Sequence, residues 1–260
     1  MKKNSTIFVL LLISAYSYAQ NLSMKQIESD LMKQYSKIIN SQLKTESKDS
    51  NSIEHNNKIF NEKIKTYTSN YPLTLDYKFD SLNQKIEILT SDDNLFRIYS
   101  WDTGMGGTMR DYENLFQFKT GGKVYSKLVF NTVKSIEEKI IPYYSRIYTV
   151  KNNNRTYYLT LSHTVYSSSV YGETVRFFRI ENNALNDSVK LIKTESGLSN
   201  EIEISLDFDS FIKRHLWIKY KPRIKTLYIP IVVENEKSKS RYRKYKFNGE
   251  YFEEQLNANR

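Results

Sequence analysis

Residues 201–208 read Glu-Ile-Glu-Ile-Ser-Leu-Asp-Phe, an uninterrupted alternation of polar and apolar side chains. Successive side chains of a β-strand point to opposite faces of its sheet, so this pattern predicts a strand with one buried face and one face in water. Strands of this kind are typical of antiparallel sheets rather than of the fully buried sheets of parallel α/β proteins.

Similar short segments fill the chain on both sides of this stretch, with turn-forming residues between them. Asn248-Gly249, between residues 245–247 and 250–252, is a strong hairpin signal. Pro230 has no amide hydrogen to donate, which predicts an edge strand at 227–233. The predicted strands are 73–79, 86–89, 95–101, 114–118, 123–130, 144–150, 156–161, 174–180, 189–193, 201–208, 227–233 and 242–252.

The first part of the chain has a helical period instead. Apolar side chains recur at spacings of three and four, and they predict one amphipathic helix up to about residue 43 and a second from residue 53 to about residue 70. We therefore expect a helical hairpin at 20–70. It precedes one mainly β domain at 71–260, an antiparallel meander in the form of a sandwich, a barrel or a small propeller-like array. If exposed, one helical stripe would offer a docking surface to a partner protein: Leu31, Tyr35 and Ile38.

Residues 1–19 have the features of a cleavable signal peptide. Lys2 and Lys3 precede the apolar run 7–13, and the small residues of Ser17-Tyr18-Ala19 form a cleavage site. The apolar run is too short to span a bilayer, and no other segment approaches transmembrane length. We expect an exported protein, periplasmic or extracellular, for which cytoplasmic nucleotides and nucleic acids are not the expected partners.

Positive charge is concentrated near the C-terminus. The chain has a formal net charge of +10, and residues 211–246 contain twelve Lys and Arg against two Glu. Aromatic residues lie among these cations, so we predict a surface for an envelope polyanion or glycan. The alternative is a set of solvated charges that keep strand edges from pairing with other molecules. The candidate polyanion-binding residues are Lys213, Arg214, Lys219, Lys221, Arg223, Arg241, Arg243 and Lys244.

The stretch 101–110, Trp-Asp-Thr-Gly-Met-Gly-Gly-Thr-Met-Arg, holds three of the eight glycines. Its glycines would present bare backbone amides to a ligand, or they would simply supply the positive φ of a tight turn capped by Asp102. The candidate ligand-binding residues are Trp101, Asp102, Gly104, Gly106, Gly107 and Arg110. Asp102-Thr103-Gly104 also matches the signature of aspartic proteases, but the chain has no second Asp-Thr-Gly or Asp-Ser-Gly to supply the partner carboxylate.

Other common chemistries have no motif here. The chain has no Cys, which excludes disulfides and thiolate metal sites, and its three His do not have metal-ligand spacing. P-loop, dinucleotide and Gly-x-Ser-x-Gly signatures are absent from the sequence as well. We therefore expect no metal and no cofactor.

Two stretches resemble exported proteins of unknown function from Bacteroidota-type bacteria: residues 90–110 and residues 245–252. The signal ending Tyr18-Ala19-Gln20 and the abundance of Lys, Asn and Tyr fit the same source. The resemblance implies no activity. The sequence thus predicts an exported, non-catalytic binding or envelope-associated protein, and the alternative is a secreted hydrolase that uses Asp102.

Overall fold

The computed structural model of the protein describes residues 22–43, 50–129, 140–152, 154–207, 216–231 and 241–255. The predicted signal peptide and the candidate cations Lys213 and Arg214 lie outside these residues. The described chain is mainly β, and a pair of N-terminal helices precedes its antiparallel sheets, so the predicted fold class is confirmed.

The two predicted helices are α2 (Met24–Leu43) and α3 (Ser50–Asn70). The first begins with a capping box: Ser23 N donates to Gln26 Oε1 (2.8 Å), and Gln26 N donates to Ser23 Oγ (3.3 Å). Because their apolar stripes face the first sheet, the helices offer no reason to expect a partner there. The stripe that would have formed a docking surface is buried: Leu31, Tyr35 and Ile38.

Residues 73–79 do not form a strand, which corrects the prediction from their alternation. The buried Arg97 donates to the carbonyl oxygens of Thr74 and Tyr77, both at 2.6 Å. Glu28 of α2 accepts hydrogen bonds from two backbone N–H groups at the start of the following turn, at 2.7 and 3.0 Å. These side chains satisfy backbone groups that a strand would satisfy through its ladder. A 3-10 helix, η1 (Pro72–Leu75), overlaps the start of this segment, and a second one, η2 (Leu82–Gln84), follows it.

The first sheet is a four-stranded antiparallel meander in the order β1-β2-β3-β4. Both faces of its second strand are covered, because Tyr99 and Trp101 pack against the helices whereas Phe96 and Ile98 face the second sheet. The strands are β1 (Glu87–Thr90), β2 (Phe96–Asp102), β3 (Tyr112–Thr120) and β4 (Lys123–Val129).

The second sheet has the order β11-β7-β6-β5, and β8 pairs with β7 beside it. The stretch with the clearest alternation forms an edge strand here, in which Leu206 is buried whereas Glu203 and Ser205 are exposed. The strands are β5 (Tyr143–Lys151), β6 (Thr156–Val165), β7 (Val170–Glu181), β8 (Ala184–Asn186) and β11 (Glu201–Asp207).

The third sheet has the order β10-β9-β15-β14-β13-β12. The predicted C-terminal hairpin is present as β14 and β15, but Phe247 pairs with Phe252, so the loop has four residues instead of two. The elements are β9 (Ile192–Thr194), β10 (Gly197–Ser199), β12 (Lys219–Lys221), η4 (Pro222–Ile224), β13 (Thr226–Pro230), β14 (Tyr242–Phe247) and β15 (Phe252–Glu254).

The edge-strand prediction from Pro230 is wrong, because β13 lies between β12 and β14. On the β14 side, Pro230 pairs with Tyr242. On the β12 side, the pairing ends two residues earlier, where Tyr228 lies opposite Lys219. Pro230 therefore lies beyond the end of β12, where its missing N–H removes no bond of that ladder.

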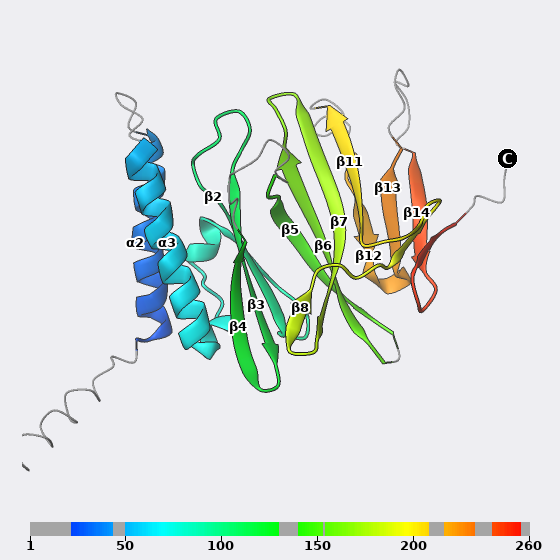
Figure 1. The fold of residues 1–260 in the computed structure, drawn as a ribbon, viewed down its shortest axis with the longest axis horizontal. Coiled ribbons are helices and arrows are strands. Elements are labelled where there is room, and N and C mark those ends of the chain that lie inside the picture. Colours follow the sequence, from blue (N-terminus) through cyan, green and yellow to red (C-terminus); the bar gives the residue numbers. More distant parts are fainter. Residues whose placement is uncertain are drawn as a thin grey trace, which may run out of the picture.

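Figure 1 shows the helix pair and the three sheets side by side as successive layers. A hydrophobic core lies between each pair of neighbouring layers. One core lies between the helices and the first sheet, one between the first and second sheets, and one between the second and third sheets. Of the three predicted forms, stacked sheets correspond to the sandwich. In the described residues, we find no helix with the length and apolar character needed to cross a membrane.

Candidate functional site

The predicted ligand-binding turn connects β2 to β3 and is tied to the helices beneath it. Tyr35 Oη donates to the carbonyl O of Asp102 (3.2 Å), and Asn57 Nδ2 donates to that of Thr103 (2.8 Å). Gly106 and Gly107 are exposed, and both have positive φ. Trp101 is fully buried in the helix–sheet core, which corrects its prediction as a ligand contact.

Asp102 acts as the cap of this turn. Its Oδ1 accepts a hydrogen bond from Gly104 N (2.7 Å), and its Oδ2 pairs with Arg110 Nη1 (3.2 Å). Within the described ranges, no hydrogen bond joins Asp102 to another carboxylate. Since aspartic protease chemistry needs two carboxylates that share a proton, the hydrolase alternative has no supporting observation here.

A methyl group at Gly106 is expected to break the turn. Its φ is +85°, and a Cβ there would collide with the carbonyl O of Met109, whereas Gly107, at φ +62°, has open space around it. We expect Gly106→Ala to lower the free energy of unfolding by about 2 kcal/mol, and Gly107→Ala by about 1 kcal/mol through its backbone conformation alone. Urea unfolding measures both variants. Equal losses would contradict the steric argument.

Four lysines meet on the outer face of the third sheet. Lys219 and Lys244 lie in one row across the strands, on either side of Tyr228, while Lys221 and Lys246 form the next row. Residues that pair across antiparallel strands share a face, so all four point away from the core. All are exposed, and within the described chain none of them forms an ion pair. We call this the lysine face: Lys219, Lys221, Lys244 and Lys246 with Tyr228 and Tyr242.

Two tyrosine rings support the lysine face. Lys219 Nζ lies 5.1 Å from the ring centroid of Tyr242, and Lys221 Nζ lies 4.8 Å from that of Tyr228. Cation–π contacts at exposed sites stabilise by about 0.5–1 kcal/mol, which helps to hold the ammonium groups above the sheet. The face therefore presents four positive charges, two of which are held over tyrosine rings.

Sequence prediction found part of this face. Lys219, Lys221 and Lys244 belong to it, whereas Lys246 was not among the candidates. Arg243 directly precedes Lys244 in β14, so its side chain points to the opposite face of the sheet. Its Nε lies 4.0 Å from Glu254 Oε1. The other two described candidate cations lie outside the paired strands: Arg223 in η4 and Arg241 before β14.

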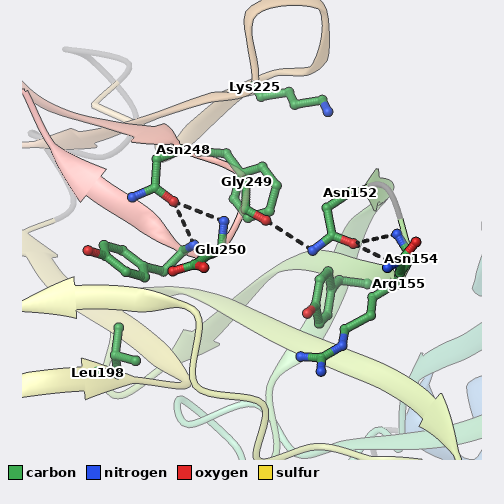
Figure 2. A pocket seen from close by; sticks show the side chains of 11 residues that line it. Asn152, Asn154, Arg155, Leu198, Lys225, Asn248, Gly249 and Glu250 are labelled. Carbon is green, nitrogen blue, oxygen red and sulfur yellow. Dashed lines mark hydrogen bonds between the residues drawn. The ribbon is translucent and has the colours of Figure 1, made fainter.

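A hollow of about 840 Å³ lies at one end of the second and third sheets (Figure 2). Two asparagine turns face each other across it. Asn152 Oδ1 accepts from Arg155 N (2.8 Å), and Asn248 Oδ1 accepts from Tyr251 N (3.0 Å). Asn152 Nδ2 donates to the carbonyl O of Gly249 (3.0 Å) and so links the two sheets. The Asn248 turn was predicted from the sequence, but its contact with the Asn152 turn was not.

A buried glutamate and a half-buried histidine lie side by side in the second sheet. Glu173 pairs with His163 across β7 and β6, and its Oε2 accepts a hydrogen bond from Ile218 N (2.5 Å). Burial raises the pKa of Glu173 to about 8, although the Ile218 bond and Lys219 lower it. Burial also lowers the pKa of His163 to about 4. Both groups are therefore uncharged over part of the neutral range.

In the first sheet, burial raises the pKa of Glu113 to about 7. The neighbouring polar groups of Asn61 and Trp101 oppose this rise, and nearby Asp111 adds to it. Protonated carboxyl groups in a protein interior are typical of catalytic acids and also of plain structural burial. Within the described residues, we find no cluster of His, Asp and Glu that would hold a metal ion.

No protein-family model, curated protein or solved structure matches this chain. The chemistry of the site therefore has to be inferred from its own residues.

Proposed function

We propose that the protein is an exported, non-catalytic binding protein that holds an anionic polymer or glycan of the cell envelope. The observation that supports this proposal is the lysine face, where four exposed ammonium groups occupy neighbouring positions on one sheet. The predicted signal peptide at residues 1–19 supplies the location, and the resemblance to exported proteins agrees with it.

Electrostatics favours a polymer over a small anion at this surface. An isolated exposed ion pair contributes about 0–1 kcal/mol, so one lysine would hold a ligand poorly. Four lysines in two rows add their fields, and a chain with repeated negative charges contacts several of them at once. Such binding weakens as salt rises, because the Debye length falls from about 10 Å at 0.1 M to about 3 Å at 1 M.

Neutralising the lysine face is expected to abolish most polymer binding. The variant carries Lys219→Gln, Lys221→Gln, Lys244→Gln and Lys246→Gln. We expect it to bind polygalacturonate at low salt at least about tenfold more weakly than the parent protein. Lipopolysaccharide and anionic phospholipid vesicles, measured in parallel by sedimentation, identify the class of polyanion.

The matched control removes four exposed lysines that lie far from this face in the sequence. One is in α3, one lies just before β1 and two are in β4: Lys65→Gln, Lys85→Gln, Lys123→Gln and Lys127→Gln. Both variants lose the same net charge, so only position distinguishes them. Equal weakening in the two variants would reduce the effect to overall charge. If the parent protein bound none of the three polyanions at low salt, the lysine face would serve solubility alone.

A further inference from the structure

The hollow of Figure 2 lies next to the lysine face. Lys225 lies at its rim and directly precedes β13, whose first residue, Thr226, pairs with both Lys221 and Lys246. Phe247 N donates to the carbonyl O of Lys225 (2.9 Å), which fixes the rim to β14. A polymer on the lysine face therefore reaches the hollow without leaving the protein surface.

The walls of the hollow are already rigid. The Asn152 and Asn248 turns each use their side-chain oxygen to bind two backbone N–H groups. The bond from Asn152 to Gly249 then locks the two turns together. Buried Tyr157 and Phe247 form part of the lining. A preformed site of this kind loses little conformational entropy when a ligand binds.

Two charged side chains in the hollow have no partner in the described part of the protein. The guanidinium of Arg155 makes no hydrogen bond or ion pair there, and the same holds for the carboxylate of Glu250. Lys225 Nζ is held by the carbonyl O of Lys151 (2.9 Å). The lining thus offers a planar double donor, a fixed cation and an acceptor.

The same lining contains exposed apolar surface. Leu198 is 45% exposed, and the ring of Tyr251 is partly exposed beside it. Lys193 Nζ lies 5.5 Å from the centroid of that ring and 2.7 Å from Glu253 Oε1. In Figure 2, Arg155 extends from the Asn152 turn on the right of the view, and Leu198 lies at the lower left.

This combination matches one class of ligand. A sugar ring has apolar C–H groups on its faces and hydroxyl groups around its edge, and a uronic acid adds a carboxylate. Arginine binds a carboxylate through two parallel hydrogen bonds, which a lysine does not reproduce. We propose that the hollow binds one uronic acid residue of an acidic polysaccharide, with its carboxylate on Arg155, its ring against Leu198 and Tyr251, and its hydroxyls on Glu250. This proposal rests on the proposed function, and it specifies the anionic polymer as a polysaccharide that contains uronic acid.

A short oligosaccharide separates this site from the lysine face. Trigalacturonic acid is titrated into the purified full chain by calorimetry, with galactotriose as the uncharged probe. We expect Arg155→Gln to weaken trigalacturonic acid binding at least about tenfold and Arg155→Lys to weaken it less. Arg146→Gln is the matched control, because Arg146 is exposed near the other end of β5. Amide chemical-shift changes are expected at Leu198, Gly249 and Tyr251.

The outcomes distinguish the two proposals. Unchanged trigalacturonic acid binding in the four-lysine variant, together with loss in Arg155→Gln, supports the hollow. Equal binding of galactotriose, or equal weakening in Arg155→Gln and Arg146→Gln, overturns the carboxylate assignment. If polygalacturonate binds the lysine face but trigalacturonic acid does not bind, the hollow fails and the proposed function stands. If trigalacturonic acid does not bind and the parent protein binds none of the three polyanions, the proposed function fails as well.

Discussion

Trp101→Ala is expected to lower the free energy of unfolding by about 3–5 kcal/mol, the usual cost of deleting a large aromatic side chain from a core. Trp101 has 0% exposure, and its ring packs edge-on against Phe60 with 5.2 Å between centroids. Losing it removes the ring contact between Phe60 of α3 and Trp101 of β2. Urea unfolding followed by circular dichroism measures the loss.

Met109→Ala is the control for this experiment, because Met109 lies in the connected turn and is 45% exposed. Its loss is expected to stay within about 0.5 kcal/mol. If Trp101→Ala kept the stability of the parent protein and lost ligand binding instead, the prediction of Trp101 as a ligand contact would be restored.

Stability is expected to fall as pH rises from about 5 to about 8. An unfolded glutamate loses its proton near its ordinary pKa of 4.5, but folding raises the pKa of Glu113 to about 7 and that of Glu173 to about 8. Between these values, the native state holds protons that the unfolded state has released, so higher pH favours unfolding. His163 has the opposite sign, because its lowered pKa costs stability only as pH falls below about 6.5.

The size of this effect is on the order of 3 kcal/mol, since one pKa unit corresponds to about 1.4 kcal/mol and burial relaxes in part. Glu173→Gln keeps an oxygen that accepts from Ile218 N and removes the charge. We expect this variant to be more stable than the parent at pH 8.5, and the addition of Glu113→Gln to flatten the profile further. Glu195→Gln, at an exposed position, serves as the control. A parent profile that rises through this range would show that the two carboxyl groups ionise freely.

The sequence predicted those elements whose pattern depends on burial of one face. The helical period gave α2 and α3, and alternation gave most strands, including β11. Three-residue strands such as β8, β10 and β12 are too short to show a period, and none was predicted. The segment 73–79 failed for a different reason. It alternates, but Arg97, which is distant in sequence, binds its backbone at Thr74 and Tyr77, and Glu28 accepts a hydrogen bond from the Tyr77 hydroxyl.

The candidate sites were harder to predict because they depend on contacts between distant residues. Trp101 stood beside a glycine-rich turn and was assigned to it, although its strand is covered on both faces. The cations near the C-terminus point to different faces of the third sheet according to their odd or even position in each strand. Which of them share a face is known only from the pairing register of the strands. Asn248-Gly249 was recognised as a turn, but nothing local to it indicated that Gly249 accepts a hydrogen bond from Asn152, 97 positions away.

The layers also differ in how the chain connects them. The described residues of 22–129 form the helices and the first sheet, and those of 140–255 form the other two sheets. Within this second half the chain passes from the second sheet to the third at β9 and β10, returns to the second at β11, and then completes the third. One covalent connection therefore joins two halves that meet through an aromatic cluster that includes Phe96, Phe116 and Phe178. Because both halves belong to one chain, their docking is an intramolecular step that does not depend on the concentration of the protein. The aromatic junction consequently needs only the affinity of a weak complex to keep the two halves assembled.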